Sequence, residues 1–85
     1  MSIFVVIPTR DQENLAKRIG ELGDHSSHKL PKGEWIVSYD GTSIELSSRL
    51  GLNKTDGNAA VVFAVNAYYG NAPTSIWEWL KARWN

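Results

Sequence analysis

Residues 35–46 decide the fold of this chain, and they read Trp-Ile-Val-Ser-Tyr-Asp-Gly-Thr-Ser-Ile-Glu-Leu. The first five, residues 35–39, are mostly apolar, β-branched or aromatic, which is typical of a strand. Asp40-Gly41 is a typical two-residue hairpin turn, so that strand could reverse there and pair with residues 42–46. This hairpin is the alternative to the interpretation that we favour.

We favour a helix after Gly41 because of the spacing of four later residues. Thr42 and Glu45 match the pattern [ST]-x-x-[EQ] of a capping box, in which each side chain bonds to the other residue's backbone N–H. Leu46 and Leu50 follow at the spacing of one helix face. The interpretation therefore gives a strand followed directly by a helix.

Two other segments have the same organisation. Residues 3–7 and 59–69 are nearly all apolar, which is typical of strands buried on both faces of a parallel sheet. Another [ST]-x-x-[EQ] pattern follows each of them, at Thr9 to Gln12 and at Ser75 to Glu78. The sequence therefore predicts the order β-α-β-α-β-α.

This order predicts an α/β fold in a single small domain that spans residues 1–85. Strand, helix and strand in succession favour parallel pairing through right-handed crossovers. We expect a three-stranded, mostly parallel sheet in the strand order 2-1-3, with helices packed on both faces. In the alternative order 1-2-3, one apolar face would be bare and would have to be covered by a second copy.

A ligand site in such a sheet is expected at the carboxyl ends of the strands, where the helices begin. Helix N-termini, two flexible glycines and one arginine could together bind a phosphate or carboxylate group. In the simpler interpretation the hydroxyl groups only cap their own helices. The residues at this predicted rim are Thr9, Arg10, Asp40, Gly41, Thr42, Ser43, Gly70, Asn71, Thr74 and Ser75.

No residue pattern specifies a reaction. His25 and His28 are spaced as a possible metal pair, but they fall in a polar segment that we expect to be a solvated loop. Asp40 has no partner pattern that would make it a catalytic base. We therefore expect no catalytic residue, no metal and no cofactor.

Four tryptophans are a large number for 85 residues, and tryptophan is enriched in protein interfaces. Trp77 and Trp84 share an apolar helix stripe with Ile76 and Leu80, so we expect them in the core. Trp79 falls on the opposite side and is the residue that we expect to contact another chain, together with Trp35. The alternative for Trp79 is that the large indole folds over the end of the sheet, and the alternative for Trp35 is that it covers the core.

The composition excludes several classes of protein. Nine Lys and Arg balance nine Asp and Glu, so the chain lacks the positive charge of a typical nucleic-acid or membrane-surface binder. It has no cysteine and no apolar run long enough for a membrane span, and we expect it in the cytoplasm. We expect a protein-interaction or self-associating module, with binding of a small anionic ligand at the rim, or an unrecognised enzymatic activity there, as the alternative.

Overall fold

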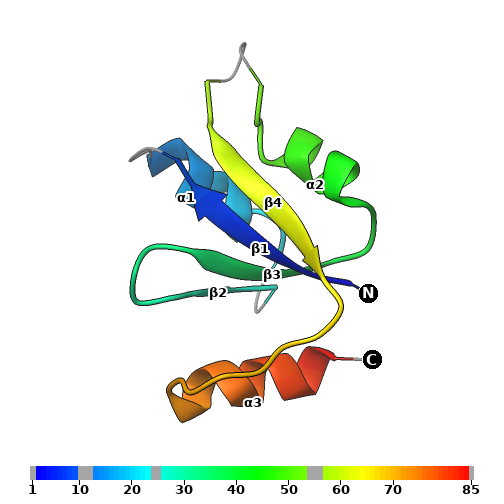
Figure 1. The fold of residues 1–85 in the computed structure, drawn as a ribbon. Coiled ribbons are helices and arrows are strands. Elements are labelled where there is room, and N and C mark those ends of the chain that lie inside the picture. The colour runs from blue at the N-terminus through cyan, green and yellow to red at the C-terminus, as the bar shows by residue number, and fades with distance from the viewer. Residues whose placement is uncertain (1, 10–12, 24–25, 54–56, 85) are drawn as a thin grey trace.

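The computed structural model describes residues 2–9, 13–23, 26–53 and 57–84. They form one antiparallel sheet with three helices (Figure 1). The strands are β1 (Ser2–Pro8), β2 (Ser27–Lys29), β3 (Trp35–Tyr39) and β4 (Ala60–Val65), in the order β2-β3-β1-β4. The helices are α1 (Glu13–Gly20), α2 (Ser43–Arg49) and α3 (Thr74–Arg83).

The predicted three-stranded, mostly parallel sheet is wrong, because the sequence analysis missed β2. This strand is only three residues long and lies in a polar segment that reads as a loop. It forms a hairpin with β3, closed by a hydrogen bond from the amide of Leu30 to the carbonyl of Glu34 at 2.7 Å. The added reversal makes β3 run antiparallel to β1.

The order β1-α1-β2-β3-α2-β4 is that of the ferredoxin-like, or split βαβ, arrangement. In each half of it, a helix joins two strands that have a third strand between them. β3 separates β1 from β2, and β1 separates β3 from β4. Helix α3 follows this unit along the chain.

The main core lies between one face of the sheet and helices α1 and α2. Fully burying an aliphatic or aromatic side chain contributes about 1.5–3 kcal/mol, so this cluster is the main source of stability in the described chain. Its buried members come from β1, β3 and the two helices: Phe4, Val6, Leu15, Ile19, Val37, Leu46 and Leu50.

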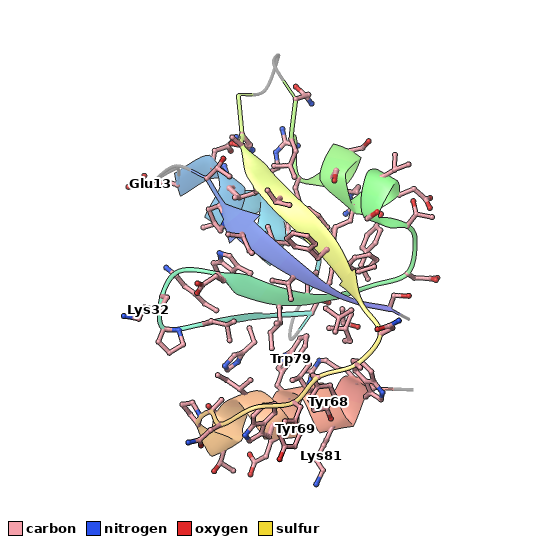
Figure 2. The ribbon with its side chains drawn as sticks, in the orientation of Figure 1. Glu13, Lys32, Tyr68, Tyr69, Trp79 and Lys81 are labelled. Carbon is pink, nitrogen blue, oxygen red and sulfur yellow. The ribbon has the colours of Figure 1, made fainter. Side chains whose placement is uncertain are left out.

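Helix α3 covers part of the opposite face. Trp79 and Leu80 pack there against Ile3 and Ile36, and Figure 2 shows Trp79 between α3 and the sheet. Trp79, which the sequence predicts to contact another chain, is buried in its own fold and only 9% exposed, so its indole packs on the sheet as in the alternative. Residues 76, 79, 80 and 84 face the sheet at i, i+3, i+4 and i+8 spacing, and Trp77, which was expected in the core, is partly buried against the same cluster.

The capping box of α2 is confirmed. The hydroxyl of Thr42 accepts from the amide of Glu45 at 3.1 Å, and a Glu45 carboxylate oxygen accepts from the amide of Thr42 at 3.0 Å. The helix ends at Leu50, and Gly51 follows with φ +70°, the left-handed conformation that glycine adopts without strain. The hairpin alternative for residues 42–46 is therefore wrong.

The other two predicted boxes have different outcomes. Ser75 does not cap α3, because the residue at the N-cap position is Pro73 and no side chain bonds to the helix start there. The box from Thr9 to Gln12 includes positions 10–12, which lie outside the described residues.

A buried amide positions the start of β4. The side-chain nitrogen of Asn58 donates to the carbonyl of Leu50 at 2.8 Å, and its oxygen accepts from Asn14 at 3.4 Å. Asn58 is thereby tied to both the end of α2 and helix α1. These bonds satisfy a polar side chain that is almost fully buried.

Candidate interaction surface

The structure separates the residues of the predicted ligand rim. Ser2 pairs with Tyr39, so Asp40, Gly41, Thr42 and Ser43 lie at the end of the sheet where β1 begins. Thr9 follows the other end of β1, roughly 20 Å away at about 3.3 Å per strand residue. The rim required parallel strands, and the antiparallel pairing of β1 with β3 removes it.

The third part of the predicted rim lies beside α3. Gly70 approaches Trp77, and Thr74 is the first residue of the helix. Asn71 and Ser75 flank that start, and the loop before it runs along α3 in Figure 1. Arg10 lies outside the described residues. β3 and β4 both end beside the start of β1, but the predicted residues after β4 lie further along the chain, beside α3, and Thr9 lies at the opposite end of the sheet.

Two rim residues have local structural roles. The Thr42 hydroxyl is used in capping α2. A Cβ atom on Gly41 would lie 2.7 Å from Cε2 of Tyr39, so a larger residue there would have to displace that ring. Tyr39 in turn packs its ring edge-on against Phe4, with centroids 6.4 Å apart. These two residues are explained by the start of α2 and by packing.

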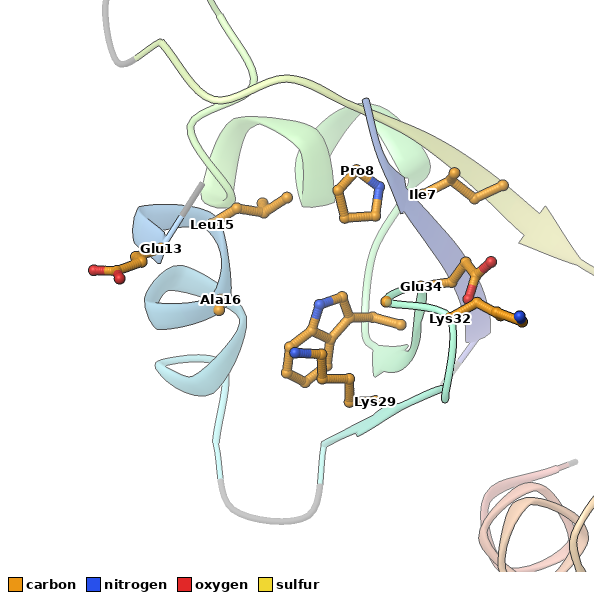
Figure 3. Close-up of a pocket in the computed structure, with 10 residues that line it drawn as sticks. Ile7, Pro8, Glu13, Leu15, Ala16, Lys29, Lys32 and Glu34 are labelled. Carbon is orange, nitrogen blue, oxygen red and sulfur yellow. The ribbon is translucent and has the colours of Figure 1, made fainter. Parts of the chain in front are cut away.

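A hollow of about 370 Å³ lies between α1 and the β2–β3 hairpin (Figure 3). The ammonium group of Lys29 lies 5.6 Å from the ring centroid of Trp35 at this site. Figure 3 shows the Glu13 carboxylate directed away from the hollow, and Lys32 and Glu34 extending on the side of Ile7. The charged groups do not converge on a common point, and Trp35 is half-buried against the main core.

The histidine expectation is only partly within the described chain. His25 lies outside it, and His28 belongs to β2 rather than to a solvated loop. The His28 ring lies 6.3 Å from the Trp79 ring. Among the described residues, no group of three or more His, Cys, Asp or Glu side chains is placed to hold a metal ion.

β4 forms one edge of the sheet, and its outer side pairs with no strand of the described chain. Thr9 donates its amide to the carbonyl of Ala59 at 3.1 Å, and Pro8, which has no N–H, lies opposite Ala60. Bonded and non-bonded pairs alternate in an antiparallel ladder, so the odd-numbered residues of β4 bond to β1. The even-numbered residues point their N–H and C=O groups outward from the sheet: Ala60, Val62 and Ala64.

An apolar patch adjoins this edge on the face that carries α3. Ile7 pairs with Val61, and Val5 pairs with Phe63. Ile7 is 38% exposed, Val61 43% and Phe63 53%, although all three lie on the sheet. The helix packs mainly against β3 and the start of β1, and Figure 1 shows it below β2, away from most of β4.

The two edges of the sheet differ in their protection. β2 is three residues long and carries Lys29, and Pro31 and Lys32 follow it. Short length, lysine and proline are the usual devices that prevent an edge from pairing with another chain. β4 is six residues long, and its sequence Ala-Val-Val-Phe-Ala-Val has no charge and no proline. We call its free edge, together with Ile7, Val61 and Phe63, the β4 surface.

The apolar run of residues 59–69 predicted a strand here, but not its exposure. The continuous apolar run was interpreted as burial on both faces, which the parallel fold would have required. The usable signal was the absence of a charge or proline from residues 59–65, which becomes informative only when that strand lies at an edge.

Comparison with known proteins adds no relative. No family model matches the sequence, and no curated protein matches it. Within the described chain, the helices are too short or too polar to cross a bilayer.

Proposed function

We propose that this protein is a self-associating interaction module that acts through the β4 surface. The observation that carries the proposal is an unprotected six-residue edge strand beside exposed Val61 and Phe63. Each outward N–H and C=O group can pair with a strand of another molecule, as in strand addition. This surface replaces Trp79 and Trp35 as the proposed site of contact, because both indoles pack within their own fold.

The proposal fits the energetics of a small domain. A chain of this size buries only about 60–65% of the surface that its unfolded form exposes, so burial of further apolar area adds to a narrow margin. Ile7, Val61 and Phe63 are adjacent and together form such an area. The setting that we propose is the cytoplasm, where a chain without cysteine needs no disulfide for its stability.

Sedimentation velocity over a range of protein concentrations tests the proposal. We expect a concentration-dependent dimer or larger species for the wild-type chain. Phe63→Lys should shift it to monomer, because a lysine on an edge strand opposes pairing. Phe63 is already half exposed, so the substitution should leave the fold intact by circular dichroism.

The matched control is Ile44→Lys, an apolar-to-lysine change at a residue of α2 that is 78% exposed and lies outside the β4 surface. This variant should associate as the wild type does. A wild-type chain that stays monomeric at high concentration would refute the proposal. Equal loss of association in both variants would also refute it, because the effect would then come from added charge alone.

A further inference from the structure

We infer that the β4 surface binds a second copy of this chain, strand against strand, with Val62 of one copy directly opposite Val62 of the other. The inference rests on the proposed function and adds the partner strand, its direction and its register. The two β4 strands would run antiparallel about a two-fold axis, which joins the two four-stranded sheets into one.

The outward backbone groups fix this register. They belong to residues 60, 62 and 64, so a two-fold axis at Val62 places 60 opposite 64, 62 opposite 62 and 64 opposite 60. All three facing pairs are then of the bonded type, and every outward N–H and C=O of the strand has a partner. The six groups have no hydrogen-bond partner among the described residues of their own copy.

Neighbouring registers pair fewer of these groups. An axis at Phe63 keeps 62 opposite 64 but places Ala60 opposite residue 66, beyond the end of β4. An axis at Val61 keeps 60 opposite 62 but places Ala64 opposite residue 58, before the strand begins. Each of these registers therefore matches only two of the three outward residues within the strand.

The side chains are also self-complementary about Val62. Residues 60–64 read Ala-Val-Val-Phe-Ala, which is nearly the same in both directions. On the face of α1 and α2, Ala60 would lie opposite Ala64 of the second copy. On the other face, Val61 would lie opposite Phe63 at a non-bonded pair, where side chains approach most closely, and an aromatic and a β-branched residue pair favourably.

The absence of charge from β4 allows a second copy to be the occupant. A strand that carries a lysine or glutamate would oppose its own copy by repulsion of like charges across the pair. β4 carries none, so symmetric pairing brings no like charges together. The exposed Val61 and Phe63 of the two copies would cover one another on the same face of the joined sheet.

Disulfide formation between single cysteine variants reads this register, because the natural chain has no cysteine. In a bonded antiparallel pair the Cα atoms lie about 5.5 Å apart, within the range of about 4.4–6.8 Å that a disulfide needs. Val62→Cys should therefore form a linked dimer in a glutathione redox buffer. Ala60→Cys and Ala64→Cys should each stay unlinked alone, since four strand residues span about 13 Å.

Mixing two single-cysteine variants gives the decisive test of the register. An equal mixture of Ala60→Cys and Ala64→Cys should form the mixed disulfide, and Ile44→Cys serves as the control for chance collision at an exposed site. Links by Val62→Cys and by the mixture, each well above the Ile44→Cys level, would support the register. A dimer in sedimentation without these links would overturn the register and leave the proposed function standing, whereas a monomer in sedimentation would overturn both.

Discussion

The guanidinium carbon of Arg83 lies 4.4 Å from the centroid of the Trp79 ring, and an Arg83 Nη atom donates to the Trp79 carbonyl at 3.2 Å. The two residues are one helix turn apart, so the arginine covers one face of the indole while the rest of the ring enters the sheet core. The indole Nε1 of Trp79 is buried without a hydrogen-bond partner among the described residues. Trp79 thus attaches α3 to the sheet through its ring rather than through its N–H.

Trp79→Ala should lower the free energy of unfolding by about 3–5 kcal/mol, the usual loss for a large buried aromatic side chain. Trp79→Phe should cost less, because it keeps a ring beneath Arg83 and removes a buried donor that has no acceptor. Urea unfolding followed by far-ultraviolet circular dichroism measures both. If Trp79→Ala had the same free energy of unfolding as the wild type, the packing of α3 would not depend on this side chain.

The Trp79 variants also distinguish an effect on folding from an effect on association. Trp79 lies outside the β4 surface, so Trp79→Phe should sediment as the wild type does at equal concentration. Loss of association in a folded Trp79→Phe variant would instead favour the last helix as the contact, which was the expectation from sequence.

Thr42→Ala should destabilise the protein by about 0.5–2 kcal/mol, because it removes the side-chain acceptor for the Glu45 amide. Ser75→Ala is the matched control. Both hydroxyls begin an [ST]-x-x-[EQ] pattern, yet Ser75 lies inside α3 and caps nothing. Its substitution should change the unfolding free energy by less than about 0.5 kcal/mol. Equal losses in the two variants, measured by urea unfolding, would contradict the caps described here.

Gly41→Ala should also destabilise the chain, since a Cβ atom would meet the Tyr39 ring at 2.7 Å and displace it from Phe4. Forcing extra volume into such a contact typically costs about 1–3 kcal/mol. Gly20→Ala provides a comparison of opposite sign. Gly20 is the last residue of α1, an added Cβ would have no neighbouring atom within 4 Å, and alanine favours a helix by up to about 1 kcal/mol. Thermal unfolding of the two variants should therefore shift in opposite directions, and a shift in the same direction would refute the packing role of Gly41.

Local signals in the sequence were informative where a few neighbouring residues settle the structure. The capping box at Thr42 and Glu45, with Leu46 and Leu50 at helical spacing, identified α2 against a strong hairpin signal. The same pattern was misleading at Ser75, because the N-cap of α3 is Pro73, two residues earlier, and the helix begins at Thr74. A capping pattern specifies the start of a helix only when no neighbouring residue suits the position better.

The direction of the strands could not be read from such signals. β2 consists of Ser27, His28 and Lys29, which are not typical strand residues, and it is stabilised by pairing with β3 rather than by its own propensity. One missed three-residue strand reversed β3 and moved Asp40 to the opposite end of the sheet from Thr9. The candidate site therefore changed from the predicted cluster of loops to the edge of β4.

Association through the β4 surface should depend little on salt, because the six residues of β4 and the adjoining Ile7 carry no charge. We expect the dissociation constant to change by less than about threefold between roughly 50 mM and roughly 500 mM sodium chloride, since screening acts only on charges. Sodium sulfate at the same ionic strength should tighten the association, because it favours burial of apolar surface. Sedimentation equilibrium in the three buffers measures these dissociation constants.

The outer side of α3 differs from the uncharged β4 surface because it carries charge, and Figure 2 shows Lys81 there pointing away from the sheet. A contact made there would change with salt because it involves charges, so a tenfold or greater loss of affinity in sodium chloride would contradict an interface on the uncharged β4 surface.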